Sequence, residues 1–402
     1  MNARRALVFI FCTVALDVLA LGFMIPVLPK LILGFEGGDT AAAAQAMGVF
    51  ATVWGLMQFL FSPLLGALSD RYGRRPVILI SCLGLGLDYL FMAIAPSLAL
   101  LFVGRVISGI TSATIGTAFA YIADVTPEDG RAKAFGTVGV AFGLGFVVGP
   151  AAGGLLGGID PRLPFWFSAA ACLANAAFGW FALPESLPPG RRMAFTWSRA
   201  NPVGALRLLT RHAELWGLAA ASFLGQVAHQ VLPAVFVLYA GYRYGWDEFT
   251  VGLVLAAVGI LSAVVQGLLV GPVVARLGER WTMVGGYLAG AVGMAIYGLA
   301  PTGDLFCVGL PVMALWGLAG PSSQGLMTRL VSGSEQGQLQ GAGASLTSLA
   351  NILGPGLFAA AFSYSLAWMP GLSWYLAAVL LVAGAGVAFA ATKPRRPDGQ
   401  LP

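Results

Sequence analysis

Charged residues are scarce in this 402-residue chain: Asp, Glu, Lys and Arg together make up 10% of it, against 58% hydrophobic residues. Soluble globular proteins carry far more charge and less apolar surface. Apolar runs of about 20 residues recur along the chain, and each is long enough to cross ~30 Å of hydrocarbon. A soluble helical protein would need amphipathic rather than uniformly apolar helices. The composition therefore predicts an all-α membrane protein.

Residues on which common enzyme sites depend are also few. The lysines are Lys30, Lys133 and Lys393, and none follows a glycine-rich phosphate-binding loop, which excludes the common ATP-hydrolysing motif. The two histidines, His212 and His229, are too far apart for a helical metalloprotease pair, and no Gly-x-Ser-x-Gly string is present. We expect no enzyme activity, no cofactor and no metal.

A net charge of +5 could indicate a nucleic-acid partner. The basic residues lie in short segments between apolar runs, however, where membrane orientation explains them better. The first apolar run is too long for a signal peptide and contains Asp17 and Pro26, so we expect it to be retained as a span. The dispersed cysteines predict buried free thiols at Cys12, Cys82, Cys172 and Cys307.

Twelve transmembrane helices account for the apolar runs. Placing both termini in the cytoplasm leaves only Lys30, Arg162 and Arg243 in outer loops, as the positive-inside rule requires. The predicted spans are residues 6–28, 43–68, 76–95, 98–122, 134–157, 163–183, 213–240, 249–275, 281–300, 304–328, 339–362 and 371–391.

The chain repeats itself after 205 residues, which predicts two pseudo-symmetric six-helix halves, 1–183 and 213–402. Between them, 184–212 is predicted as a cytoplasmic linker. Asn201 and Pro202 suit the start of a short helix on the membrane surface, although a plain connector explains this stretch equally well. The repeat pairs Gly66 with Gly271, Gly73 with Gly278, and Gly149-Pro150 with Gly354-Pro355.

Three charged residues fall inside predicted spans, where ionisable groups are rare and usually functional. Asp17 lies midway along the first span, where a carboxylate costs about 2.5–3.5 kcal/mol on insertion scales. Asp88 lies towards the outer end of the third span, and Arg105 near the start of the fourth. We predict proton exchange at the two acids, tuned by the arginine. The alternatives are a packing pair for Asp17, simple hydration for Asp88 and snorkelling for Arg105.

Two glycine-containing strings and several polar residues complete the candidates. The string 66–75 is a charged loop in a chain with little charge. The string 145–154, in the fifth span, combines glycines that permit close helix contact with a bending proline; packing without a gating role is its alternative. The second half offers cavity candidates that equally suit interhelical hydrogen bonds: Gln226, His229, Gln230, Gln266, Gln324 and Asn351.

Together these strings resemble the major facilitator superfamily and its twelve-helix drug/proton antiporters, and over essentially the whole chain they are similar to the tetracycline efflux proteins. The resemblance implies that Asp17, Asp88 and Arg105 line the transport path. It also implies a cytoplasmic charge cluster of Asp70, Arg74 and Asp124. The first-loop motif falls on Gly66, Asp70, Arg71, Gly73, Arg74 and Arg75, and the antiporter motif on Gly145, Gly149, Pro150, Gly153 and Gly154.

The chain departs from those proteins at two points. Their ninth helix carries an acid where this chain has Gly290, and a histidine of their eighth helix is replaced near Ser262. We expect proton-coupled efflux of tetracycline-like or other amphiphilic aromatic compounds by alternating access. The expected setting is the inner membrane of a bacterium, as a monomer with lipid, drug and protons as partners and neither ATP nor nucleic acid. The alternatives are uptake of a metabolite on the same fold, or a non-transporting receptor or assembly factor.

Overall fold

The computed structural model describes residues 3–112, 114–126, 128–193, 209, 213–332 and 335–392. Within these ranges the regular structure is helical and contains no strand. The described residues form two compact units, which the chain enters more than once. Unit 1 has the bounds Met1–Pro202, Gln230–Ile260 and Asn351–Pro370, and unit 2 has the bounds Val203–His229, Leu261–Ala350 and Gly371–Pro402. The predicted division into 1–183, 184–212 and 213–402 stays a prediction.

Unit 1 begins with a broken first span. After α1 ends at Met24, a turn that contains Pro26 leads into α2, which has Pro29 in its first turn. The other helices of unit 1 are α3 (Thr40–Tyr72), α4 (Arg74–Ile94), α5 (Leu98–Thr111), α6 (Thr114–Val125), α7 (Glu128–Ile159), α8 (Leu163–Ala182) and α10 (Val231–Tyr244), with α1 at Ala3–Met24 and α2 at Leu28–Phe35.

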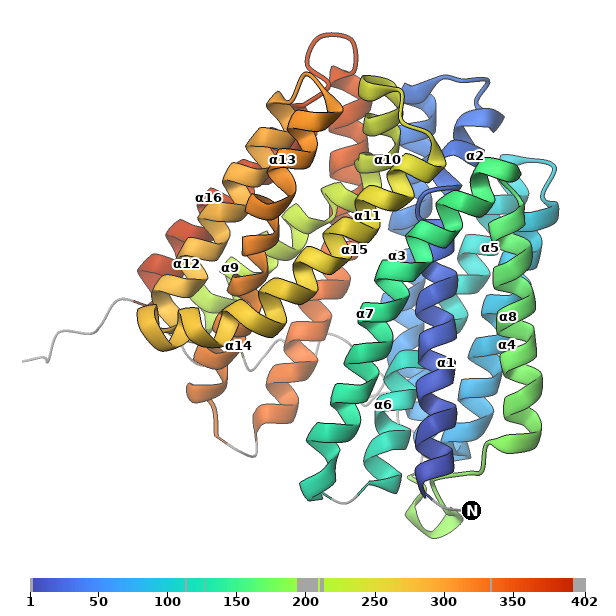
Figure 1. The fold of residues 1–402 in the computed structure, drawn as a ribbon. Helices are drawn as coiled ribbons and strands as arrows, with labels where there is room; N and C mark the ends of the chain where they lie inside the picture. The colour runs from blue at the N-terminus through green and yellow to red at the C-terminus, as the bar shows by residue number, and fades with distance from the viewer. Residues whose placement is uncertain are drawn as a thin grey trace, which may run out of the picture. The chain divides into compact units, whose positions relative to one another are not determined.

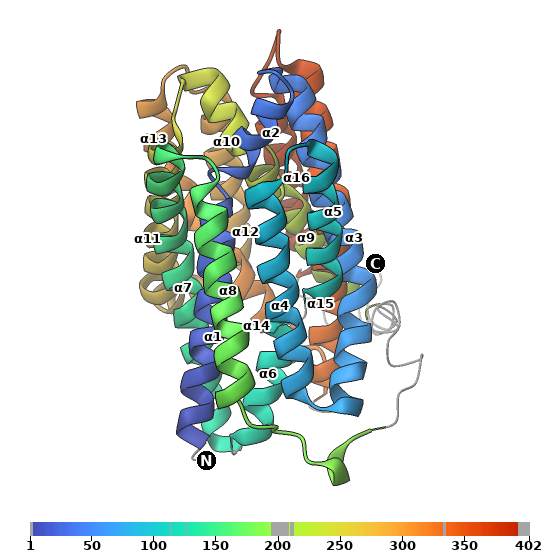
Figure 2. The ribbon, with the colours of Figure 1, turned by 90° about the vertical axis from the view of Figure 1, so that its right-hand side faces the viewer.

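Within unit 1, α1 packs against α7 and α8, and α4 packs against α5 and α8 (Figures 1 and 2). A buried cluster fills the space where α1, α4, α6 and α7 meet, and it includes Ile10, Val14, Ile78 and Tyr121. This cluster, and the packing of both helices on α8, place the first and third spans, which carry Asp17 and Asp88, in one part of unit 1.

α3 also meets segment 351–370 of the later chain inside unit 1. The Thr52 hydroxyl donates to the Ile352 carbonyl at 3.1 Å, and Gln45 donates to Ser363 at 2.9 Å. At another edge of the unit, Lys30 of α2 forms an ion pair with Glu248 at 3.3 Å. Asp247 accepts the Thr250 backbone N–H at 2.8 Å, and this contact with Thr250 and the nearby positive charge of Lys30 lower the Asp247 pKa.

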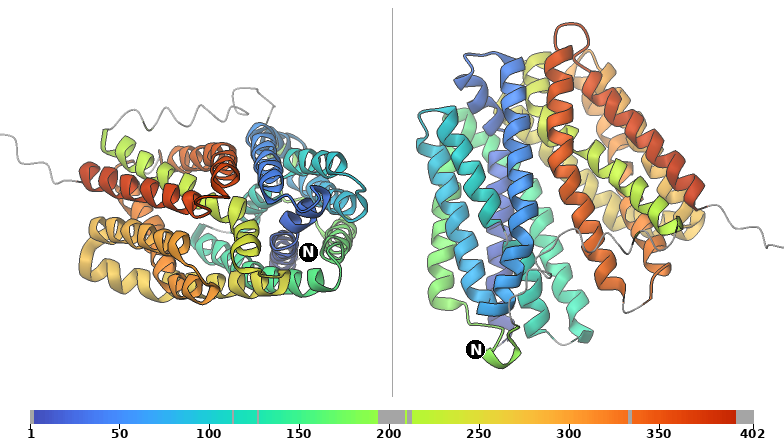
Figure 3. Two further views of the ribbon diagram at one scale, coloured as in Figure 1. Left: turned by 90° about the horizontal axis from the view of Figure 1, so that it is seen from above. Right: turned by 180° about the vertical axis from the view of Figure 1, so that it is seen from behind.

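Unit 2 contains the remaining helices. α12 packs against α13, α14 and α16, and α16 also packs against α9, which Figure 3 shows as red and yellow-green ribbons side by side. Tyr297 stacks on Phe306 with ring centroids 4.0 Å apart and meets Trp374 edge-on. Its elements are α9 (Ala213–His229), a π-helix (Val265–Leu269), α12 (Val270–Leu299), α13 (Gly303–Ala314), a 3-10 turn (Leu315–Leu318), α14 (Ala319–Arg329) and α16 (Leu372–Ala391).

Two long helices, α11 (Glu248–Val264) and α15 (Gln336–Ser365), contribute residues to both units. The described residues contain 11 apolar helical stretches long enough to cross a membrane, one of them 52 residues long at Glu248–Leu299. Gly278 breaks that stretch, because its φ of 76° and ψ of 161° are not helical. The stretch therefore holds two of the predicted spans, and the fold has the twelve expected.

Two details differ from the sequence-based expectation, and a third is untested. α3 continues to Tyr72, so most of the charged string 66–75 is helical and only Gly73 separates α3 from α4. The thiol of Cys12 is exposed and that of Cys307 partly exposed, so the prediction of four buried thiols is wrong for these two. Their helix faces lie on the outside of an apolar molecule, where burial is unnecessary. The predicted surface helix after Asn201 lies outside the described residues.

Candidate functional site

A buried ion pair joins α4 to α5 in unit 1. Arg105 donates to the Asp88 carboxylate, which is completely buried, while Arg105 is 6% exposed. A Cβ on Gly104 would lie 2.8 Å from Asp88 Oδ1, so the absence of a side chain there leaves room for the acid. The geometry excludes a hydrated Asp88 and a snorkelling Arg105. Each charge instead offsets the cost of burying the other.

Asp17 lies in α1 and is 8% exposed. One turn before it, the Thr13 hydroxyl donates to Asn175 of α8 at 3.2 Å, which fixes the rotation of α1 about its axis. The charges of Asp17 and Asp88 both act on the Tyr89 hydroxyl and on the Cys172 thiol. The two predicted acids therefore share one neighbourhood of α1, α4 and α8, in which Arg105 supplies the positive charge.

The glycines of the antiporter motif place α7 in direct backbone contact with its neighbours. A Cβ on Gly149 would lie 2.7 Å from the Gly22 Cα, and one on Gly153 would lie 2.6 Å from the Phe23 Cα. On another side of α7, a Cβ on Gly154 would lie 2.2 Å from the Glu248 carbonyl oxygen. Gly145 likewise meets Val18, so the motif serves close packing on α1 and α11. Pro150 lies within α7.

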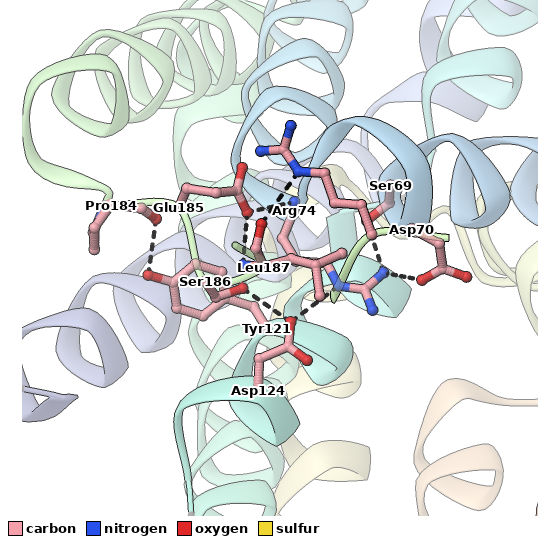
Figure 4. Close-up of polar contacts among 10 residues, drawn as sticks. Ser69, Asp70, Arg74, Tyr121, Asp124, Pro184, Glu185, Ser186 and Leu187 are labelled. Carbon is pink, nitrogen blue, oxygen red and sulfur yellow. Dashed lines mark hydrogen bonds and ion pairs between the residues drawn. The ribbon is translucent and has the colours of Figure 1, made fainter. Parts of the chain in front are cut away.

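The predicted charge cluster is present at the end of unit 1 where α3 turns into α4 (Figure 4). Arg74 donates to Asp70 of α3, and its Nε donates to Asp124 of α6 at 3.1 Å. It also donates to Ser69 at 3.0 Å. One guanidinium thus ties together three helices. Arg71 and Arg75 lie outside this network, over the rings of Tyr72 and Trp180, and Gly66 has open space around it.

The segment after α8 completes the cluster, and sequence reasoning missed it. Glu185 accepts the Arg74 backbone N–H at 2.8 Å, and Ser186 donates to Asp124 at 3.0 Å. Tyr121 donates to the Pro184 carbonyl at 3.0 Å, also visible in Figure 4. A Cβ on Gly73 would lie 2.1 Å from a Glu185 oxygen, and its φ of 113° favours glycine as well. The polar run that follows the sixth span is the signal that could have found these residues.

Unit 2 repeats this arrangement with the charges exchanged. Arg329 donates to Glu279 at 2.8 Å, and these residues stand 205 positions after Asp124 and Arg74. Gly278 has a positive φ, as Gly73 does. Arg280, the counterpart of Arg75, lies over the ring of Phe389 and donates to its carbonyl, just as Arg75 does with Trp180. The repeat seen in the sequence is therefore a repeat of contacts.

Three of the polar candidates of the second half, His229, Gln230 and Gln266, lie at helix irregularities. α9 ends at His229 and α10 begins after Gln230, which donates to Asn351 at 2.7 Å. Gln266 lies in the π-helix and Trp316 in the 3-10 turn. Such interruptions of membrane helices frequently mark binding sites, because they expose backbone groups and reorient side chains.

The structure brings some of these candidates together and leaves others apart. In unit 2, the exposed ring of His229 lies 5.6 Å from that of Trp316, and Gln266 lies beside Gly317. Gln324 has a buried Nε2 without a hydrogen-bond partner among the described residues, and Gln226 is exposed. Gln230 and Asn351 belong to unit 1. The predicted six therefore divide between the units, with Gln226, His229, Gln266 and Gln324 in unit 2 and Gln230 and Asn351 in unit 1.

A family model described as Major Facilitator Superfamily matches residues 7–355 and 231–402. The chain belongs to the Major Facilitator Superfamily. Within it, the chain is 39% identical over 380 residues to the class C tetracycline resistance protein of Escherichia coli, covering 94% of this chain and 95% of that protein. It is 34% identical to the class B protein of Escherichia coli, covering 91% and 92%. A crystal structure of the nucleoside transporter NupG superposes with a TM-score of 0.78 at 16% identity, covering 98% of this chain and all of that one, which confirms the major facilitator fold.

Proposed function

We propose that this protein is a multi-pass membrane transporter that expels an amphiphilic aromatic compound, such as a tetracycline, in exchange for protons. The observation that carries the proposal is the buried neighbourhood of Asp17, Asp88 and Arg105, on a chain similar along its length to proteins named for tetracycline resistance. A scaffold or receptor gains nothing from the cost of burying three charges.

The proposed cycle needs drug and proton to exclude one another. With the site open to the cytoplasm, an ionised Asp17 accompanies bound drug. With the site open to the outside, protonation of Asp17, assisted by Asp88, discharges the drug and lets the empty carrier return. Each proton that enters releases about 2.3 kcal/mol per 100 mV of membrane potential. That free energy corresponds to about a fortyfold drug gradient.

Cargo contacts are proposed on both units. In unit 2, His229 and Trp316 offer two neighbouring rings tilted by 49°, with Gln266 beside them as a hydrogen-bonding group. In unit 1, Gln230 and Asn351 offer an amide pair. Gly290 departs from the resembling efflux proteins, and a Cβ there would lie 2.8 Å from the Trp316 ring. The indole occupies the space that an acidic side chain would need. We therefore propose that the cargo is bound at this point by contact with aromatic rings more than by a charged group.

The charge cluster around Arg74 and the antiporter motif at Gly149-Pro150 are proposed to control access to the site. The cluster ties α3, α4 and α6 at one end, and the motif holds α7 against α1 and α11. Both termini are proposed to lie in the cytoplasm of a bacterium, with the protein acting as a monomer in the inner membrane.

Inverted membrane vesicles test this function. We expect an imposed proton gradient to drive drug accumulation, with one or more protons released per drug, and Asp17→Asn to abolish both while leaving the protein in the membrane. Drug export by a well-folded Asp17→Asn protein at the wild-type rate would refute the mechanism. Drug uptake in the same direction as protons would favour the metabolite symporter.

A further inference from the structure

One hydroxyl connects the Asp88–Arg105 pair to the neighbouring helix α3. Ser108 is 1% exposed, lies one turn after Gly104 on the face of α5 that meets the Asp88 carboxylate, and accepts the Trp54 indole N–H at 3.3 Å. A serine hydroxyl has one hydrogen to donate and accepts through its oxygen. Donation to a charged carboxylate makes the stronger bond, so an ionised Asp88 orients the hydroxyl and presents its lone pairs to the indole.

Protonation of Asp88 changes this arrangement. A neutral carboxyl carries an O–H donor of its own and is a weaker acceptor, so the Ser108 hydroxyl loses its preferred direction. Other titratable or charged groups lie near Asp88: Tyr89 of α4, Arg105 of α5 and Cys172 of α8, and the charge of Asp17 of α1 acts on the same Tyr89 and Cys172. Ser108 supplies a hydrogen bond from this neighbourhood to α3.

α3 carries the connection further within unit 1. Two residues before Trp54, Thr52 donates to the Ile352 carbonyl at 3.1 Å. One residue after it, a Cβ on Gly55 would lie 2.8 Å from the Asn351 carbonyl oxygen, so these two backbones touch. Asn351 in turn accepts the Gln230 side chain at 2.7 Å. α3 therefore lies between the buried ion pair and the amide pair proposed to contact cargo.

We propose that Ser108 and Trp54 are positioning residues that transmit the protonation of Asp88 through α3 to Gln230 and Asn351. Proton and drug then exclude one another through a change of side-chain placement, without sharing an atom. The inference rests on the proposed proton exchange at Asp88, and it adds the route by which that exchange is felt.

The same two helices supply a matched control. Gln58 of α3 donates to Ser112 at the end of α5 at 3.1 Å, one turn further along both helices. This contact staples α3 to α5 as the Trp54–Ser108 contact does, but it does not touch Asp88. A merely structural role predicts equal effects at the two positions.

The experiment compares Ser108→Ala, Trp54→Phe, Ser112→Ala and Gln58→Leu in the full chain, reconstituted in liposomes with tetracycline as the probe. The readout is drug affinity between acidic and neutral pH, together with protons released per drug. We expect Ser108→Ala and Trp54→Phe to weaken the dependence of affinity on pH about fivefold or more, the lower end of typical coupling between sites. Ser112→Ala and Gln58→Leu should keep the wild-type dependence, and Ser108→Thr should restore it.

Three outcomes contradict the inference or its basis. Equal losses at Ser108 and Ser112 would show a structural staple and overturn the proposal. A wild-type pH dependence in both Ser108→Ala and Trp54→Phe, alongside its loss in Asp88→Asn, would overturn the proposal and leave the proposed function standing. An Asp88→Asn protein with unchanged pH dependence would instead remove the proton role of Asp88 itself.

Discussion

Asp88 and Arg105 show at the scale of single residues why the proton site is sensitive to its partner. Removing one member of a buried ion pair typically costs about 3–5 kcal/mol, because the other charge is left uncompensated. A carboxylate escapes that cost by taking a proton, whereas a guanidinium cannot. The complete burial of Asp88 therefore makes its charge depend on Arg105.

Gly149 is a second residue whose type is set by its surroundings, because a neighbouring backbone leaves no room for a side chain. We expect Gly149→Ala to lower the free energy of unfolding by about 1–3 kcal/mol, the usual cost of overpacking. The added methyl would lie 2.7 Å from the Gly22 Cα, which is backbone and cannot rotate away. Thermal unfolding in detergent measures this. Gly143→Ala in the same helix is the control, since its methyl meets nothing within 4 Å, and an equal loss there would contradict the explanation.

At the scale of helices, the two ion pairs at the repeat positions differ in how they meet the helix dipole. Arg74 begins α4 and Asp124 lies at the end of α6, so each charge faces the helix end of its own sign. Glu279 follows the break at Gly278 and Arg329 ends α14, so both are favoured. The pair in unit 1 is held against the dipoles by extra acceptors, among them Asp70 and Glu185.

This contrast predicts unequal effects of mutation. Glu279→Ala should lower the free energy of unfolding by only ~0.2–1 kcal/mol, as for exposed ion pairs, because the Arg329 side chain is 73% exposed. Arg74→Ala should lower the free energy of unfolding by about 1.5–3 kcal/mol, the range for a hydrogen bond to a charged group. It should also impair export. Chemical unfolding and vesicle transport measure the two effects. Equal costs for the two variants would show that the extra acceptors around Arg74 do not outweigh its unfavourable place at the start of α4.

For the whole molecule, the proposed orientation in the membrane follows from where the charges gather. The Arg74 cluster and the Glu279–Arg329 pair stand at corresponding ends of the two repeats, after the second and before the ninth span. Lys30 and Glu248 stand at the opposite ends of their spans. By the positive-inside rule, the loops of a membrane protein that are rich in Lys and Arg lie in the cytoplasm.

Labelling with a membrane-impermeant maleimide tests this orientation. In a background without the four native cysteines, we expect Ser97→Cys to react in intact cells and Gly190→Cys to react only after permeabilisation. Both positions are exposed, and a side chain at Gly190 meets nothing within 4 Å. The reverse pattern would invert the proposed topology.

Much of the fold could be predicted from the sequence, because apolar runs and loop cations report directly on membrane spans. Asp17, Asp88 and Arg105 were found for the same reason: a charge within an apolar run is conspicuous. Ser108 and Trp54 were missed because serine and tryptophan are ordinary in membrane helices. Only the packing of α5 on α4 brings Ser108 to Asp88, and only that of α3 on α5 brings Trp54 to Ser108.

The ion pair and the π-helix of the second half could not be predicted for a different reason. The offset of 205 residues also links Asp124 to Arg329 and Arg74 to Glu279, but the two charges are exchanged between the repeats, so no identical residues mark the pair in the sequence. Residue type alone also does not predict the π-helix around Gln266, because it depends on how consecutive turns pack. Pairing residues of opposite charge at the 205-residue offset would identify the Glu279–Arg329 pair from the sequence.

The joins between the two compact units have a mechanical consequence. The chain passes from one to the other at His229–Gln230, where α9 gives way to α10, and at Ile260–Leu261, a turn before the π-helix of Val265–Leu269. It passes again at Ala350–Asn351, a turn before Pro355 inside α15. Pro-containing and irregular turns bend more easily than regular helix. The polypeptide therefore has built-in flexure points where it crosses between its parts, and stiffening them should slow turnover.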